Sequence, residues 1–157
     1  MTYVNGNIGK VHQIIRHTVC GYVYPCTFDG FKNSGNRCTN CKYKSERLCR
    51  EFFEDITGHR FAKSRPKFLG GLELDGYCSE INMAFEYNGI QHYQVRRSLV
   101  PYDDEEKLQE RQENDMIKID ICAKNGIKLC VIPYTYNCYE PKKLEAFIKC
   151  WIFSLDL

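Results

Sequence analysis

Apolar residues recur along the chain with two periods, and these periods predict its helices and strands. Over residues 45–57 an apolar side chain returns at every fourth position, which predicts an amphipathic helix. A second helix is predicted over residues 103–125, opened by four acidic residues that suit a helix N-terminus. A third is predicted over residues 141–155, and we expect its apolar stripe to face the core.

Strands are predicted where apolar and polar residues alternate, or where a short run is wholly apolar. Residues 11–16 form the first such segment, residues 69–76 and 80–88 the next two, and residues 127–132 the last. Because the helix over residues 103–125 separates the last two strands, we expect them to pair in parallel through a right-handed crossover. The pattern predicts an α/β domain in which helices flank a sheet.

Two carboxylates stand out in the central strands. Asp75 lies near the end of the second predicted strand, and Glu86 lies near the end of the third. The run before Glu86 is apolar, as in a strand covered on both faces, so burying this carboxylate is costly unless a cation neutralises it. Two carboxylates on adjoining strands are what a hard divalent cation needs for oxygen ligation.

Ten cysteines are the unusual feature of the composition, and five of them lie in the first third of the chain. His17 and Cys20 form one pair three residues apart, and Cys38 and Cys41 form another. One imidazole and three thiolates at these spacings suit a tetrahedral, structural zinc ion. Cys26 is a rival ligand, and Cys49 is a weaker one.

We expect residues 1–44 to form this small zinc-binding module and residues 45–157 to form the α/β domain. Because so small a module has almost no core, zinc would supply much of its folding free energy. Five further cysteines of the second domain lie among apolar neighbours, so we expect buried thiols there. These are Cys78, Cys122, Cys130, Cys138 and Cys150.

The net charge of the chain is only +2, so total charge does not indicate a nucleic-acid partner. A local basic stretch does, because residues 59–67 contain four Lys and Arg residues next to the proposed carboxylate site. A solvated connector explains this stretch equally well. No apolar run approaches the roughly 20 residues that span a bilayer, and the first residues lack the features of a signal peptide. We therefore expect an intracellular protein, in the cytoplasm or nucleus, with no membrane partner.

Three segments carry longer motifs. Residues 84–93 read Ala-Phe-Glu-Tyr-Asn-Gly-Ile-Gln-His-Tyr, residues 65–77 contain Asp75, and residues 114–118 read Asn-Asp-Met-Ile-Lys. Together with the paired zinc ligands, these segments resemble the PD-(D/E)xK nuclease superfamily in its very-short-patch-repair (Vsr-like) form. The likeness extends to the treble-clef zinc finger that is fused to such nucleases in phages and large DNA viruses.

The resemblance implies a restriction-endonuclease-like fold, with a mixed sheet flanked by helices. It implies that Asp75 and Glu86 hold Mg²⁺ or Mn²⁺. Glu46, in the first turn of the helix over residues 45–57, would be a third acidic group, either a ligand or a water-orienting residue. Taken alone, a glutamate there is usual, because it complements the helix dipole.

One residue departs from the superfamily pattern. The lysine that names the superfamily is expected two residues after Glu86, and Asn88 stands there instead. An asparagine can position a water molecule, but it cannot supply charge to a transition state. His92 and Lys118 are the candidates for the missing function.

The resemblance therefore implies a metal-dependent endonuclease that hydrolyses the backbone phosphodiesters of DNA, most simply of a duplex. The zinc module and the basic stretch would position this duplex. The missing lysine keeps an alternative open, a catalytically inactive zinc-finger DNA-binding or transcription-associated protein on the same fold. RNA as the substrate, nicking against double-strand cutting, and the oligomeric state are also open at this point.

The paired ligands predict one zinc ion per chain. Replacing Cys38 or Cys41 by serine should lower the zinc content and unfold the N-terminal module, because the metal supplies its folding free energy. Elemental analysis of the purified protein measures the stoichiometry, and Cys26→Ser is the matched control. Loss of zinc in Cys26→Ser, with zinc retained in Cys41→Ser, would show that Cys26 is a zinc ligand and that Cys41 is not.

Overall fold

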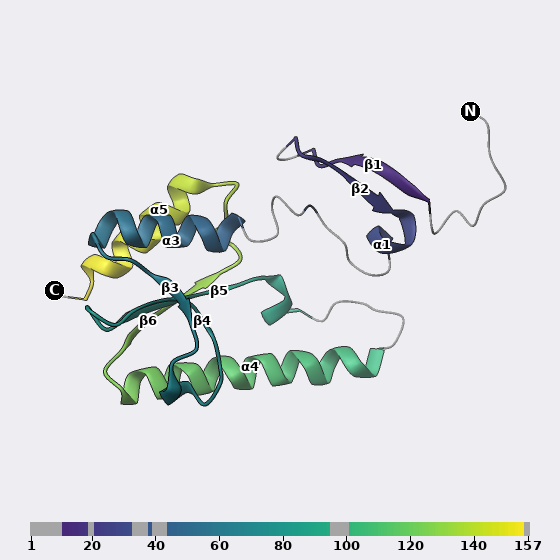
Figure 1. The fold of residues 1–157 in the computed structure, drawn as a ribbon. Coiled ribbons are helices and arrows are strands. Elements are labelled where there is room, and N and C mark those ends of the chain that lie inside the picture. Colours follow the sequence, from purple (N-terminus) through teal and green to yellow (C-terminus); the bar gives the residue numbers. More distant parts are fainter. Residues whose placement is uncertain (1–10, 19–20, 33–37, 39–43, 95–100, 156–157) are drawn as a thin grey trace. The chain divides into compact units, whose positions relative to one another are not determined.

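The computed structural model describes residues 11–18, 21–32, 38, 44–94 and 101–155. The chain divides into two compact units, Met1–Lys44 and Ser45–Leu157 (Figure 1). Each unit has hydrophobic core residues of its own. Within the described ranges, no helix is long and apolar enough to cross a membrane.

The first unit contains a β-hairpin followed by a short helix. Strands β1 (His12–Arg16) and β2 (Val23–Thr27) pair antiparallel, and helix α1 (Phe28–Lys32) follows directly. The strand predicted over residues 11–16 is therefore confirmed. In the loop between the strands, the N–H of Gly21 donates to the carbonyl of His17 at 2.8 Å. Gly21 has a φ of 71°, a conformation that glycine adopts without steric cost.

The zinc site predicted in this unit is only half described. His17 follows β1 directly, and Cys38 is buried in a small cluster that also contains Cys26. Cys20 and Cys41 lie outside the described residues. Cys26 and Cys38 are buried in one cluster, as a zinc site with Cys26 as a ligand would require. The ligand set with Cys26 and the set with His17, Cys20, Cys38 and Cys41 both stay predictions.

The second unit is a mixed α/β domain on a four-stranded sheet. Its elements in chain order are α3 (Lys44–Thr57), β3 (Ala62–Ser64), η2 (Lys67–Leu69), β4 (Leu74–Cys78), β5 (Met83–Asn88), η3 (Ile90–His92), α4 (Pro101–Lys124), β6 (Lys128–Pro133) and α5 (Pro141–Phe153). The strand order is β3-β4-β5-β6, with antiparallel pairing except between β5 and β6, which are parallel. The three predicted helices and the predicted parallel pair are confirmed.

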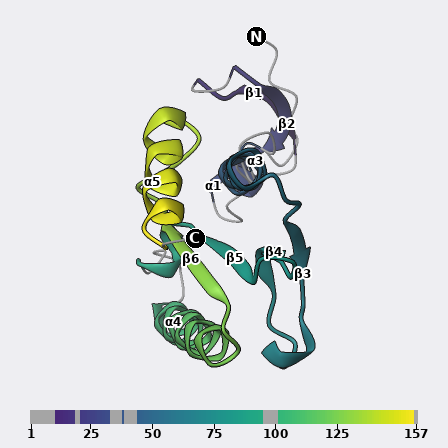
Figure 2. The same ribbon diagram turned by 90° about the vertical axis from the view of Figure 1, so that its left-hand side faces the viewer.

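Helices cover both faces of this sheet, with α3 and α5 on one face and α4 on the other (Figures 1 and 2). On the first face, Phe53 of α3 and Ile148 of α5 pack with Phe85 of β5, and all three are fully buried. On the second face, Cys122 of α4 packs with Ala84 of β5. Strand β5 therefore lies in the core with its neighbours β4 and β6 on either side.

The two central strands begin later than the pattern predicts. The strand expected over residues 69–76 is wrong at its start, because η2 occupies the first residue and β4 begins at Leu74. Gly70 and Gly71 have φ values of 60° and 99°, so the chain turns there instead of extending. The strand expected over residues 80–88 likewise begins only at Met83, after Asn82 with a φ of 49°.

Gly76 allows the ring of Phe85 to pack across β4. Gly76 pairs with Phe85, and a Cβ built at Gly76 would lie 2.0 Å from a ring atom of Phe85. The Phe85 ring also stacks on Phe53 with 4.9 Å between centroids, so it has no free space into which to move. Glycine is therefore required at this position for packing rather than for backbone conformation.

Three of the five cysteines that were expected to be buried in this unit are buried. Cys78, Cys122 and Cys130 are buried, as predicted. The prediction is wrong for Cys138, which is half-buried, and for Cys150, which is exposed on α5. An apolar neighbourhood in the sequence did not distinguish the buried face of this helix from its outer face.

Candidate functional site

Asp75 and Glu86 lie next to one another because β4 and β5 are antiparallel. The ladder of this hairpin ends with the pair Gly76 and Phe85, and Asp75 and Glu86 are the residues that adjoin this pair on the two strands. The prediction that each carboxylate ends its strand is wrong for Asp75, which is the second residue of β4. The start of β4 meets the end of β5 in this hairpin, and the N–H of Tyr87 donates to Asp75 Oδ2 at 2.9 Å.

Glu86 is a carboxylate in the core, with only 6% of the residue exposed. Burial, and secondly the negative charge of Asp75, raise the pKa of Glu86 to about 7. Lys118 of α4 opposes this effect, because its Nζ lies 3.0 Å from Glu86 Oε1. The Lys118 side chain is itself only 13% exposed, so the ion pair is largely removed from water.

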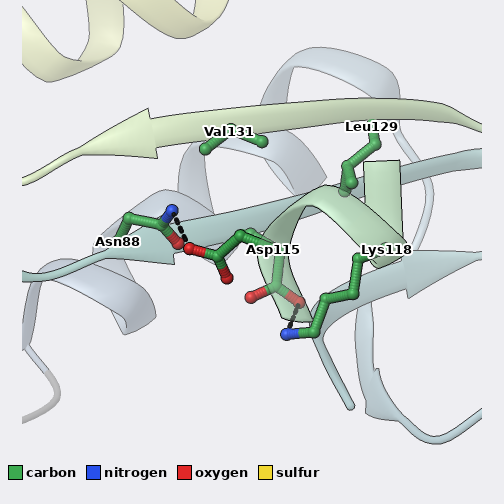
Figure 3. Close-up of a pocket in the computed structure, with 6 residues that line it drawn as sticks. Asn88, Asp115, Lys118, Leu129 and Val131 are labelled. Carbon is green, nitrogen blue, oxygen red and sulfur yellow. Dashed lines mark hydrogen bonds and ion pairs between the residues drawn. The ribbon is translucent and has the colours of Figure 1, made fainter. Parts of the chain in front are cut away.

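Asp115 lies one helical turn before Lys118 and joins two more predicted residues. Its Oδ2 accepts hydrogen bonds from Asn88 Nδ2 at 3.0 Å and from His92 Nδ1 at 2.8 Å; the bond to Asn88 is drawn in Figure 3. An ionised carboxylate only accepts, so we assign the proton of the neutral His92 ring to Nδ1. The other ring nitrogen, Nε2, is then a proton acceptor.

A small cavity lies among these side chains. Its volume is about 10 Å³, room for about one water molecule. The residues that line it are Glu86, Asn88, Asp115, Lys118, Leu129 and Val131, five of which are labelled in Figure 3. Asn88 Oδ1 is buried and receives no hydrogen bond from the described residues. Asn88 therefore brings an unused acceptor to the lining of this cavity.

Glu46 is linked to Asp75 by two cations. Arg50, one turn further along α3, donates from Nη2 to Glu46 Oε1 at 3.2 Å and to the backbone carbonyl of Asp75 at 2.7 Å. Lys63 Nζ lies 3.6 Å from Glu46 Oε1 and 3.6 Å from Asp75 Oδ1. Glu46 is thus held at the Asp75 side of the site, and Lys118 lies on the Glu86 side.

The structure therefore joins all the predicted site residues of this domain in one connected set. They are Glu46, Asp75, Glu86, Asn88, His92 and Lys118. Sequence reasoning missed the roles of Arg50, Lys63 and Asp115. Asp115 did carry a signal, because a residue three positions before Lys118 shares its helix face. Lys63 appeared only as one cation of the basic stretch over residues 59–67.

That basic stretch is partly neutralised within the domain. Part of it forms β3, and its Lys63 and Arg65 make ion pairs with Glu73 at 3.2 Å and 3.0 Å. These two cations are therefore engaged with acidic side chains in this structure. The sequence pattern indicated either a phosphate contact or a solvated connector for this stretch. Neither interpretation included the ion pairs with Glu73.

The donor set of the site fits an oxygen-liganded divalent cation. Within the described part of the chain, no group of three or more His, Cys, Asp or Glu side chains is arranged to hold a metal. Mg²⁺ needs fewer, because it is commonly bound through one or two carboxylates, with water and substrate oxygens completing its shell. A cation between Asp75 and Glu86 would also relieve the repulsion that helps to raise the pKa of Glu86.

The raised pKa of Glu86 predicts how the metal-free protein responds to pH. Its ordinary value is 4.5, so from about pH 4.5 to pH 7 the folded protein retains a proton that the unfolded chain has released. This contribution to stability is complete below pH 4.5 and is lost as the pH rises through 7. In EDTA at pH 8, Glu86→Gln should therefore melt above the wild type, by roughly 5 °C, with the gap closing toward pH 5.

The control for this measurement is Glu51→Gln, which changes an exposed glutamate on α3 that pairs with Arg47. It should show no such trend in thermal melts followed by circular dichroism. Identical melting of Glu86→Gln and the wild type at both pH values would mean that Lys118 fully compensates the burial of Glu86.

Comparison with known proteins finds relatives in viruses, and no family model or solved structure matches the chain. The chain is 33% identical over 107 residues to uncharacterized protein 033L of Invertebrate iridescent virus 3, and 30% identical over 115 residues to uncharacterized protein 307L of Invertebrate iridescent virus 6. These matches cover 64% and 59% of the chain, and 53% and 56% of the relatives, so the chain spans about half the length of these two proteins.

A third relative is matched over more of its length. Uncharacterized protein 094L of Frog virus 3 (isolate Goorha) is 33% identical over 124 residues, which is 75% of this chain and 76% of that protein. On this identity and coverage, the chain belongs to the same family as protein 094L of Frog virus 3.

Proposed function

We propose that this protein is a metal-dependent DNA endonuclease with a restriction-endonuclease-like domain and an N-terminal zinc module. The observation that carries the proposal is the pair Asp75 and Glu86, adjacent on antiparallel strands, with the ammonium of Lys118 3.0 Å from Glu86. Two carboxylates and a lysine brought together in this way are suited to phosphodiester hydrolysis. The resemblance of the surrounding motifs to PD-(D/E)xK nucleases supports the same reaction.

Asp75 and Glu86 would hold the Mg²⁺ or Mn²⁺ ion, which when bound polarises the phosphate and activates water. Lys118 would supply the positive charge that Asn88 cannot, because its Nζ reaches the Glu86 carboxylate from α4. A charge fixed in a site with little water is worth more to a developing negative charge than one in solvent. Asn88 would position a water molecule through its unused Oδ1.

His92 and Asp115 would handle a proton in this reaction. Asp115 holds the Nδ1–H of His92 at 2.8 Å, which leaves Nε2 free to accept a proton from water. The same carboxylate holds Asn88, so one group on α4 orients both residues. This arrangement gives Asp115 a positioning role rather than a direct one.

The substrate that we propose is duplex DNA. The zinc module and the cations of residues 59–67 would contact its backbone, because contacts to phosphates position a protein on a duplex without reading its sequence. Such contacts make binding weaken steeply with salt. The three relatives described above come from two invertebrate iridescent viruses and Frog virus 3, and a nuclease of this kind would act in the infected cell.

Glu86→Gln tests the centre of this proposal. The change keeps volume and hydrogen-bonding capacity but removes the charge that binds the cation, so the fold should survive and cleavage should fall to background. Asp75→Asn should behave the same way. The double variant should be no worse than either single variant, as expected for residues that act through one shared ion. Nicking of supercoiled plasmid with Mg²⁺ or Mn²⁺ is the measurement.

Glu80→Gln is the matched control, because Glu80 precedes β5 in the same hairpin but lies at the exposed end, paired with His59. It should cut like the wild type. If the wild type binds DNA but does not nick it with either metal, the catalytically inactive DNA-binding protein replaces the nuclease. If Glu86→Gln cuts at the wild-type rate, the assignment of this carboxylate pair is wrong.

Asp115→Asn tests the proton-handling pair. An asparagine can donate to His92 Nδ1 and thereby move the ring proton to Nε2, where it blocks acceptance of a proton. Cleavage should slow by roughly 10²-fold, the low end for acid–base assistance, as it should in His92→Ala. The two changes together should cost no more than His92→Ala alone.

Glu113→Gln provides the comparison on the same helix, because Glu113 is two positions before Asp115 and on another face of α4. It should leave the rate unchanged. Additive losses in His92→Ala and Asp115→Asn would show that Asp115 does not act through His92, and would remove its positioning role toward that residue.

A further inference from the structure

Lys63 lies at an irregular point of the sheet, opposite Asp75. In the antiparallel pair of β3 and β4, Ala62 pairs with Tyr77 and Ser64 with Leu74, so the register shifts between these two pairs. Two steps along β3 therefore oppose three along β4, and Lys63 faces the added residues. Such irregularities redirect side chains at sheet edges, and here the shift places the Lys63 ammonium over the acidic end of β4.

The ammonium occupies the side of Asp75 that a metal ion would use. Asp75 Oδ2 is engaged by the N–H of Tyr87 at 2.9 Å, and Asp75 Oδ1 faces Lys63 Nζ at 3.6 Å. Glu46 and Glu73 approach the same Nζ at 3.6 Å and 3.2 Å. One lysine thus balances three carboxylates whose mutual repulsion would otherwise destabilise this edge of the sheet.

The Lys63 side chain is also able to move away from Asp75. Its side chain is 43% exposed, whereas that of Lys118 is 13% exposed. Its closest acid is Glu73, which is itself 35% exposed, and partly exposed ion pairs of this kind contribute little to stability. A lysine ammonium on a four-carbon stem can therefore exchange one anionic partner for another at small cost.

We propose that Lys63 is a tethered cation that competes with the divalent metal for Asp75 and turns to a phosphate of the DNA once the metal is bound. This role rests on the proposed function, because it requires a metal at Asp75 and Glu86. In the metal-free protein, Lys63 neutralises the acidic edge. With metal bound, two cations on one carboxylate oxygen repel each other, and the displaced ammonium lies beside the site where a phosphodiester would be bound.

Titration of the full-length protein with Mn²⁺, without DNA, tests the competition. Lys63→Ala should bind Mn²⁺ about threefold to tenfold more tightly than the wild type, because a partly exposed competing charge is gone. Lys63→Arg should bind it like the wild type. Arg65→Ala is the matched control, because Arg65 pairs with Glu73 and is not paired with Asp75, so its removal should change Mn²⁺ affinity little. Isothermal titration calorimetry measures each affinity.

DNA binding provides a second readout that a purely structural lysine would not affect. In Ca²⁺, used as a cation that supports binding without cleavage, Lys63→Ala should bind duplex DNA more weakly than the wild type. The slope of log affinity against log salt should fall by about 0.9, the value for one lost phosphate contact. In EDTA this loss should be much smaller, because Lys63 is then held by the carboxylates.

The outcomes separate this inference from the proposed function. Equal or weaker Mn²⁺ binding by folded Lys63→Ala overturns the competition, and the nuclease proposal stands if Glu86→Gln abolishes Mn²⁺ binding. Should neither the wild type nor Lys63→Ala bind Mn²⁺, both proposals fall. If Lys63→Ala does not fold, Lys63→Gln replaces it, because glutamine keeps hydrogen bonds to the carboxylates without the charge.

Discussion

A negative charge inside the sheet is the constraint on which the α/β domain depends. Glu86 belongs to β5, which has strands on both sides and helices on both faces, so its carboxylate cannot turn to the solvent. A buried carboxylate must be protonated, paired or bound to a cation. The adjacent Asp75 makes protonation more favourable still, and Lys118 provides the opposing charge. The polar groups of the domain are arranged around this requirement.

Those polar groups come from elements that the hydrophobic clusters hold in place. Helix α4 packs on β5 through Cys122 and presents Asp115 and Lys118 on one face, one turn apart. Helix α3 packs through Phe53 and presents Glu46 and Arg50 at the other side of the strand pair. Side chains on helices and strands keep a geometry that loops do not, which is why we place the chemistry here.

The sequence predicted what depends on local spacing and missed what depends on register. Helix periodicity located α3, α4 and α5, and the strand–helix–strand order predicted the parallel pairing. The start of β4 was wrong, because alternation continues through Gly70 and Gly71 while their positive φ values turn the chain. Asp75 and Glu86 lie together only because the hairpin turns between Cys78 and Met83. The expected strands, over residues 69–76 and 80–88, would have paired Asp75 with Ile81. No spacing in the sequence reveals the register shift that sets Lys63 over Asp75.

The parallel connection between β5 and β6 has a consequence for the order in which the site assembles. Asp75 and Glu86 are joined by one short hairpin, whose contacts are local and quick to form. The lysine that neutralises Glu86 is 32 residues away, on a crossover helix that must close a long loop before it docks. During folding the two acids therefore meet first, and Glu86 lacks its paired lysine until α4 arrives. For that interval a proton is a counter-charge for Glu86 that needs no loop closure, so mild acidity eases the step in which the hairpin forms.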